Sequence, residues 1–321
     1  MKLVLRFGLF AALFLSALSF AGALSPNLDA INHFRPFIFA AFLALAAFAA
    51  FLRARAAMLA ALFLAAAQFY FLATELAPKI GVERALASNA RLKLVTLNML
   101  DTRTDPQALV SFVERERPDV LVLVEAWPNV VATLDRVEEL MPYRFDCFEA
   151  RSCDISVLSR LPFRSAKVWR PGPDDPPEPR FPALARLQIV KDGMPVTLWA
   201  THLHWPFPAD EQEAEFANLK TRLADAEPNT ILAGDFNSTP WSYALRRFDA
   251  ATPLTRVTRA LPTWPSTNAT FRGRFTLPAF GPVMPLDHVY LGTGLAAADI
   301  RRGPNLGSDH YPVIVEIAPS S

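Results

Sequence analysis

Charged side chains are scarce in the first 90 residues, which hold seven basic and three acidic side chains. Residues 91 to 321 hold the remaining 25 basic and 28 acidic side chains, a net charge of −3. The overall basicity that favours nucleic acid as a partner is therefore missing. The sequence also shows no internal repeat. The chain divides into an apolar N-terminal part and a near-neutral body.

Cysteine is scarce as well, because the chain holds only Cys147 and Cys153. They lie six residues apart in "DCFEARSCD", so in an oxidising compartment they can form a local disulfide that closes a hairpin. The alternative is a pair of reduced, small core residues. The sequence predicts the disulfide if the body lies outside the cytoplasm.

Long apolar stretches fill the N-terminal part. They are residues 9–24, 37–52 and 56–73. With its flanks, each approaches the roughly 20 residues that cross about 30 Å of hydrocarbon as a helix. A soluble helix carries a polar stripe, which these stretches lack, so membrane insertion is favoured over a buried helical bundle. We predict three transmembrane helices, at about residues 4–24, 34–52 and 56–77.

The loop charges predict the orientation of these helices. Lys2 and Arg6 precede the first helix, and Arg53 and Arg55 lie between the second and third. The positive-inside rule places both groups in the cytoplasm. The first stretch also resembles a cleaved signal peptide, but its removal would leave the far end of the chain on the same side. We expect an integral membrane protein whose body is periplasmic or extracellular.

The body alternates apolar strands with amphipathic helices after a linker at residues 78–90. The clearest strands are residues 91–98, 119–125, 195–203 and 229–237, and the clearest helices are residues 105–117 and 209–224. Strands that are apolar along their whole length indicate sheets that other layers cover on both faces. The body is therefore expected to be an α/β domain over about residues 91–318.

Polar side chains gather where these strands end. They are Asn98, Glu125, His202, Asp235 and Asn237. Asp287 opens a later apolar strand, and Asp309 and His310 lie on a glycine-led turn before the last strand. Each residue alone has a structural explanation as a cap, a turn or a buried histidine. Together they indicate one site assembled at strand ends.

The ordered motifs "TLNML", "LVEAW", "THLHW", "AGDFNSTP", "LDHVYL" and "GSDHYP" resemble the endonuclease/exonuclease/phosphatase superfamily. This superfamily includes deoxyribonucleases, AP endonucleases, neutral sphingomyelinases and inositol polyphosphate phosphatases. The resemblance implies a four-layer α/β sandwich in which two mixed β-sheets lie face to face with helices outside. It also implies hydrolysis of a phosphate ester with Mg²⁺ or Mn²⁺.

The resemblance further implies a role for each polar residue. Glu125 matches the metal-binding glutamate, with Asn98 beside it as a hard oxygen ligand and Asp309 in the metal region. His310 matches the histidine that acts at the phosphate, as general base or transition-state stabiliser. Asp287 matches the residue that orients this histidine. Asp235 and Asn237 match residues that position water or phosphate, and His202 matches a second phosphate-contacting histidine.

These expectations describe a membrane-anchored phosphodiesterase whose substrate, nucleic acid or lipid head group, stays undecided. A phosphomonoesterase of the inositol phosphate type is an alternative. So is a non-catalytic, membrane-tethered binding protein that retains the fold. The sequence predicts no oligomeric state.

The orientation is testable with reporters fused after Ser321. A reporter that works only outside the cytoplasm should be active, and a reporter that works only in the cytoplasm should be silent, because an odd number of spans carries the chain across. The reverse pattern would contradict the orientation and remove the reason to expect a disulfide.

Overall fold

The structure, a computed structural model, describes most of the chain. The described residues are 1–76, 91–148, 153–168, 183–267, 270–271, 275–276 and 281–320. The linker predicted at residues 78–90 lies outside these ranges.

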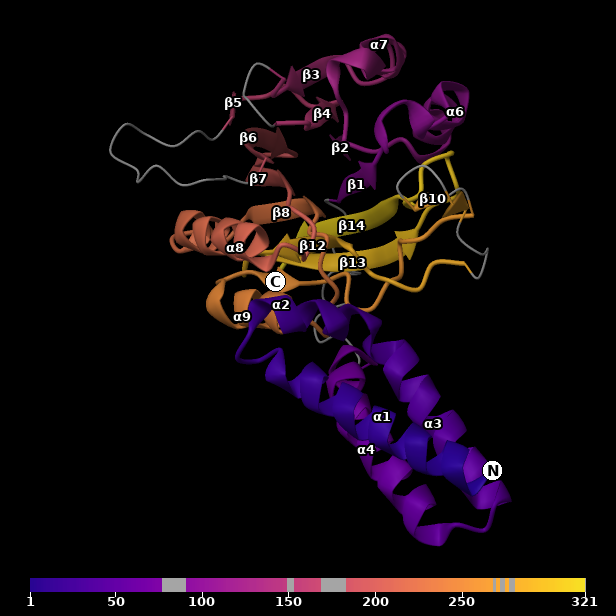
Figure 1. The fold of residues 1–321 in the computed structure, drawn as a ribbon. Helices are drawn as coiled ribbons and strands as arrows, with labels where there is room; N and C mark the ends of the chain where they lie inside the picture. Colours follow the sequence, from indigo (N-terminus) through magenta and orange to yellow (C-terminus); the bar gives the residue numbers. More distant parts are fainter. Residues whose placement is uncertain are drawn as a thin grey trace.

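The N-terminal part is a bundle of three long helices, which Figure 1 shows projecting from one end of the layered body. They are α1 (Lys2–Ala21), α3 (Arg35–Phe51) and α4 (Arg55–Leu76), with short helical turns α2 (Pro26–Asp29) and η1 (Ala30–Phe34) between the first two. Helices α1 and α4, and the stretch Pro26–Phe51 that ends with α3, are long and apolar enough to cross a membrane. Their outer surface exposes Phe7, Phe10 and Phe63. Such a surface suits lipid rather than water.

The first sheet of the body is mixed and six-stranded, in the order β13-β14-β1-β2-β4-β3. Its strands are β1 (Leu92–Asn98), β2 (Val120–Val124), β3 (Tyr143–Asp146), β4 (Ser156–Ser159), β13 (Leu295–Arg302) and β14 (Val313–Pro319). Strands β1 and β2 run parallel, and the other neighbours are antiparallel.

The second sheet repeats this plan in the order β5-β6-β7-β8-β12-β9. Its strands are β5 (Ser165–Val168), β6 (Ala183–Lys191), β7 (Met194–His202), β8 (Thr230–Asp235), β9 (Thr255–Arg256) and β12 (Asp287–Leu291). Its one parallel pair is β7 and β8. A small hairpin of β10 (Thr270–Phe271) and β11 (Phe275–Thr276) stands apart.

Alternate residues of each strand build different layers, as the two-residue period of a strand requires. In β1, Leu94 belongs to the core between the two sheets, whereas Val95 packs under the helices that cover the outer face. Those helices are α6 (Pro106–Glu116) and α7 (Val131–Glu138) on the first sheet, and α8 (Ala209–Leu223) and α9 (Tyr243–Ala251) on the second. The predicted four-layer α/β sandwich is confirmed (Figure 1). Short 3₁₀ turns η2 (Asp101–Arg103) and η3 (Pro128–Val130) connect the elements.

Cys147 and Cys153 are buried and form a disulfide beside β3 and β4. The two strands pair antiparallel from Tyr143–Ser159 to Asp146–Ser156. The disulfide therefore closes this hairpin next to the last strand pair, in an arrangement that suits an oxidising compartment.

The helical bundle is docked on the body through hydrogen bonds. The Asp29 carboxylate accepts hydrogen bonds from the backbone N–H groups of Tyr243, at 2.9 Å, and Ala244, at 2.8 Å. These groups begin α9, so a residue of the first loop caps a helix of the body. The Trp241 indole donates to the His33 carbonyl at 3.1 Å.

A buried ion pair forms the second contact between the bundle and the body. Arg256 donates to both Glu75 oxygens at 3.0 Å and to Asp249 at 2.8 Å. The Arg256 and Glu75 side chains are only 5% and 6% exposed. Burial alone would lower the pKa of Arg256, but these carboxylates raise it above its ordinary value. Removing either partner would leave a buried charge without full compensation.

This docking predicts a large effect of a conservative substitution at Glu75. Glu75→Gln should lower the free energy of unfolding of the full chain in detergent by about 3 kcal/mol, because it leaves the buried Arg256 guanidinium short of a counter-charge. The control is Glu213→Gln, whose partner Arg247 is 48% exposed. That variant should lose less than about 1 kcal/mol. Equal losses in denaturant titrations of the two variants would contradict the docking.

Candidate functional site

The strand register aligns three site residues across the second sheet. His202 of β7 lies opposite Asp235 of β8, and Asp235 lies opposite Asp287 of β12. Each belongs to the alternate positions that build the core between the sheets, as their neighbours Ala200, Ala233 and Val289 do. The three side chains therefore end the inter-sheet layer as a polar row.

Asn98 brings the first sheet into this row. It ends β1, and its amide donates to Glu125 Oε1 at 2.9 Å and to Asp235 Oδ2 at 3.0 Å. Its own oxygen accepts from the Leu100 backbone N–H at 2.8 Å. The amide nitrogen of Asn98, rather than its oxygen, thus faces the carboxylates and holds one from each sheet together.

His310 completes one end of the row. Its Nδ1 lies 2.8 Å from Asp287 Oδ2, and its Nε2 lies 3.7 Å from Asp235 Oδ2. Burial alone would lower the pKa of His310, but Asp287 and Asp235 raise it well above its ordinary value. The two buried carboxylates therefore favour the imidazolium form of His310.

The pKa of Asp235 is also raised, but here burial is the cause rather than the opposing effect. Its side chain is fully buried, and burial raises the pKa of Asp235 to about 6, against the pull of His310 and with the help of Asp287. Oδ2 of Asp235 faces Asn98 and His310, and Oδ1 accepts a hydrogen bond from the Asn237 backbone N–H at 2.7 Å. A carboxylate whose pKa lies near neutral pH is suited to accept a proton.

A second histidine–carboxylate pair lies at the other end of the row. His202 Nδ1 lies 2.8 Å from Asp154 Oδ2, and His202 Nε2 lies 3.4 Å from the Asn237 amide. Burial disfavours the imidazolium, but Asp154, Asp235 and Glu125 outweigh it and raise the pKa of His202 to about 9. Sequence analysis missed Asp154. Its signal was an acidic residue two positions before the apolar strand β4, similar to Asp287, which opens the apolar strand β12.

Asp309 lies on the turn of His310 but makes different contacts. Its carboxylate accepts from the Trp264 indole at 3.1 Å. Among the described residues, no hydrogen bond or ion pair joins Asp309 to Asn98 or Glu125. The neighbouring Ser308 hydroxyl donates to the Asn98 carbonyl at 2.7 Å and fixes the turn against β1.

Two glycines allow the close approaches that this edge needs. Gly234 precedes Asp235 with φ +151°, and a Cβ there would lie 1.8 Å from the Thr201 carbonyl oxygen. Gly307 leads the final turn with φ +100°, and a Cβ there would lie 2.7 Å from the Arg103 carbonyl oxygen. Both positions exclude any larger residue.

His288 shows how alternation separates site from core. It follows Asp287 on β12 and therefore points to the opposite face, where its ring lies against Phe236 and its Nε2 lies 2.9 Å from the Ser238 carbonyl. Burial lowers the pKa of His288 well below its ordinary value. This neutral, hydrogen-bonded imidazole is structural.

Comparison with known proteins identifies the family to which this chain belongs. Residues 95–310 match the sequence profile of the Endonuclease/Exonuclease/phosphatase family. The chain belongs to this family. No curated protein matches the chain significantly.

Solved structures share the fold of this endonuclease/exonuclease/phosphatase chain. One is TDP2 from D. rerio complexed with single strand DNA product, with a TM-score of 0.56 and 17% identity over 71% of this chain and 99% of that chain. Another, an endonuclease/exonuclease/phosphatase from Beutenbergia cavernae DSM 12333, has a TM-score of 0.56 and 18% identity over 73% and 72%. SmcL has a TM-score of 0.52 and 17% identity over 70% and 98%. At these identities the likeness concerns the fold.

Enzymes of this family generally use divalent metals, and the donor set here fits such a cation. Ligand atoms of Asp235, Asp287 and His310 lie within 4.8 Å of one another. One oxygen each of Asp154, Asp287 and Asp309 is buried without a hydrogen-bond partner among the described residues. Carboxylate oxygens suit Mg²⁺ or Mn²⁺, whereas the His310 imidazole could bind a cation only after losing its proton.

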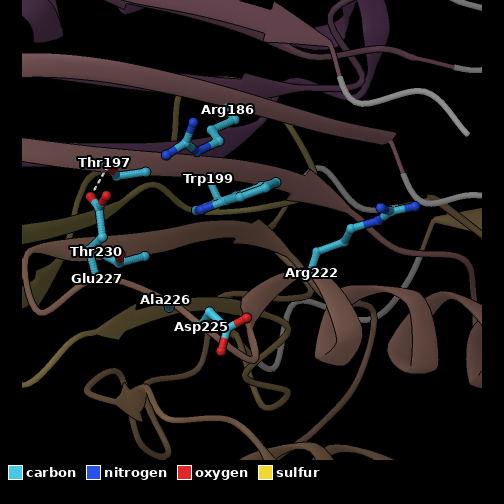
Figure 2. A pocket seen from close by; sticks show the side chains of 8 residues that line it. All are labelled: Arg186, Thr197, Trp199, Arg222, Asp225, Ala226, Glu227 and Thr230. Atoms are coloured by element: carbon cyan, nitrogen blue, oxygen red, sulfur yellow. Dashed lines mark hydrogen bonds between the residues drawn. The ribbon is translucent and has the colours of Figure 1, made fainter. Parts of the chain in front are cut away.

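A separate hollow lies on the outer face of the second sheet. Figure 2 shows this cavity of about 230 Å³. Its lining residues are Arg186, Thr197, Trp199, Arg222, Asp225, Ala226, Glu227 and Thr230. Thr197 lies in the middle of β7, five residues before His202 and about 16 Å away along the strand. The cavity is therefore distinct from the histidine–carboxylate row.

The pair of His202 and Asp154 predicts a titration. In the full chain labelled at histidine, NMR should show His202 titrating near pH 9, and Asp154→Asn should move its pKa toward or below the ordinary value, because burial then prevails. Because the folded pKa is raised, the pair stabilises the fold fully below about pH 6.5 and loses this contribution as pH rises through about 9.

The resonance is assigned with His202→Gln, and the control is Asp146→Asn, since Asp146 pairs with Arg144 at 2.6 Å rather than with His202. A pKa of His202 that is the same in wild type and Asp154→Asn would show that the carboxylate does not hold the imidazolium.

Proposed function

We propose that the protein is a membrane-anchored, metal-dependent phosphoesterase that hydrolyses a phosphodiester. The observation that supports this most is the row of His202, Asp235 and Asp287, which His310 extends and which Asn98 joins to Glu125. It gathers two imidazolium groups and several carboxylates at one edge of the sandwich. A phosphodiester needs positive charge near its oxygens, a positioned water and help for the leaving oxygen.

In this proposal the two histidines act on the phosphate as cations. His202 and His310 are protonated at neutral pH, since nearby carboxylates raise the pKa of each. Each can donate a hydrogen bond to a phosphoryl oxygen, and Asp154 and Asp287 keep the rings oriented. The charge state favours His310 as a transition-state stabiliser over a general base.

Asp235 then takes the proton of the attacking water. Its pKa of about 6 leaves it mostly ionised at neutral pH yet basic enough to accept a proton. Asn237, whose amide donates to the Leu203 carbonyl at 2.9 Å, is held beside it to orient water or phosphate.

Glu125 is the residue that we propose to hold the metal, with Asn98 as its support and Asp309 in the same region. The Glu125 side chain is 25% exposed, unlike the buried Asp235 and Asp287, so a cation can reach it from solvent. When bound, Mg²⁺ or Mn²⁺ would neutralise charge on the phosphate.

The proposed location is outside the cytoplasm. Two observations support it: the basic residues Lys2, Arg6, Arg53 and Arg55 at the end of the helical bundle away from the body (Figure 1), and the disulfide of Cys147 and Cys153. The TDP2 structure with a DNA product supports nucleic acid as one phosphodiester that this fold accommodates.

The test is hydrolysis by the full chain in detergent with Mg²⁺, Mn²⁺ or EDTA. The panel holds plasmid DNA, RNA, sphingomyelin, an inositol polyphosphate and bis-p-nitrophenyl phosphate. Turnover should need metal, and His310→Ala and Glu125→Gln should each lower it on the order of 10²-fold or more, because each removes a group that acts on the reacting phosphate.

Glu213→Gln on the exposed face of α8 is the matched control and should keep full turnover. Activity that survives both EDTA and His310→Ala would contradict the proposal. A correctly folded chain that binds metal but turns over no ester would favour the binding-protein alternative.

A further inference from the structure

The loop between β7 and α8 presents two exposed aromatic side chains. Trp205 is 59% exposed and Phe207 is 68% exposed. Among the described residues from 91 onward, no large apolar side chain is more exposed, and the next, Trp127 and Tyr143, are each 39% exposed. A soluble domain rarely leaves neighbouring aromatic groups in water unless they serve an interaction.

One end of this loop is fixed to the candidate site. The loop follows His202 directly, and the Asn237 amide donates to the Leu203 carbonyl at 2.9 Å. The buried Gln212 side chain donates to the His204 carbonyl at 2.6 Å and to the Phe236 carbonyl at 3.2 Å. The loop is therefore held by the same backbone that carries Asp235 and Asn237.

The other end of the loop is fixed to the membrane bundle. Pro206 and Ala209 line a small cavity together with Pro26, Asp29 and His33. The Ala209 backbone N–H also donates to Asn27 Oδ1 at 3.4 Å. These contacts keep the two aromatic side chains beside the segment that joins α1 to α3.

That joining segment, which includes α2 and η1, lies at the end of the helical bundle next to the body (Figure 1). It links the ends of two helices of 20 and 17 residues, each close to the thickness of a bilayer. Its flanks expose Leu24 at 92% and Phe34 at 53%. Tryptophan is enriched where hydrocarbon meets head groups, because its ring is apolar and its N–H is polar.

We propose that Trp205 and Phe207 enter the head-group layer of the leaflet on this side, so that the histidine–carboxylate row opens onto the bilayer. Building on the proposed function, this assigns the substrate class: a phosphate ester of a membrane lipid. The contacts of the loop with the segment that joins α1 to α3 favour the bilayer as its partner over a soluble nucleic acid. Only two residues separate His202 from Trp205, so the loop begins at the row.

The first test locates the loop. Both native cysteines are in a disulfide, so Trp205→Cys introduces one reactive thiol for an environment-sensitive fluorophore. In proteoliposomes of phosphatidylcholine and phosphatidylglycerol, its emission should shift to shorter wavelength and be quenched at least threefold by nitroxide lipids. The control is Ser165→Cys on β5. Ser165 pairs with Gln188 of β6, which pairs with Thr197 in the middle of β7, five residues before the site histidine. A fluorophore at 205 that is as exposed to water as the fluorophore at 165 would overturn the proposal.

The second test concerns the substrate. Trp205→Ser combined with Phe207→Ser should lower the ratio of turnover on bilayer esters to turnover on bis-p-nitrophenyl phosphate about tenfold. The bilayer esters are phosphatidylglycerol, phosphatidylinositol and sphingomyelin. The control is Tyr143→Ser on strand β3, at the end of the body far from α1, α3 and α4 (Figure 1). This substitution should leave the ratio unchanged.

These outcomes separate the two proposals. The lipid substrate would be refuted, and the phosphoesterase proposal kept, by either of two results. One is turnover of DNA or of the soluble ester without turnover of any lipid. The other is a ratio that the double substitution leaves unchanged. A lipid-buried fluorophore in a chain that hydrolyses nothing would refute the phosphoesterase while keeping the membrane contact of the loop.

Discussion

The alignment of His202, Asp235 and Asp287 across three neighbouring strands is the constraint on which the rest of the site depends. Because a shift of one residue turns every side chain of a strand to the other face, the apolar core between the sheets sets which polar residues meet at its edge. The same pattern that buries Ala200, Ala233 and Val289 therefore orients the row. The glycine at 234 lets β8 approach β7 closely enough to maintain it.

Burial of this row costs free energy, but it also shifts the pKa values of the row's side chains. A buried carboxylate without a partner would become neutral, yet each one here faces an imidazole, an amide or a backbone N–H. Burial raises the pKa of Asp235 to about 6 while its neighbours raise the pKa of His202 to about 9. Both pKa values are thus raised, so that Asp235 can accept a proton near neutral pH while His202 stays protonated and can donate one. The proposed chemistry follows from this division.

The membrane helices are part of the folded unit rather than a loose tether. Asp29 caps α9, Glu75 neutralises the buried Arg256, and the His33 carbonyl accepts from Trp241. All of these contacts fall on the segment that follows Asp235 and Asn237 or on the helix and strand after it. The orientation of the site relative to the three long helices is thereby set by hydrogen bonds and one ion pair, which an isolated body would lack.

The sequence by itself determined the architecture and most of the site. Long apolar stretches, uninterrupted strands and polar residues at strand ends depend on local pattern, so three long helices, a four-layer sandwich and the positions of Asn98, Glu125, His202 and His310 were all predictable. The pairing of His202 with Asp154, the placement of Asp309 beside Trp264, and the docking of Asp29 and Glu75 were not. Each joins residues that lie 45 to 214 positions apart. Which distant residues meet depends on how sheets and helices pack, and only the tertiary structure decides that.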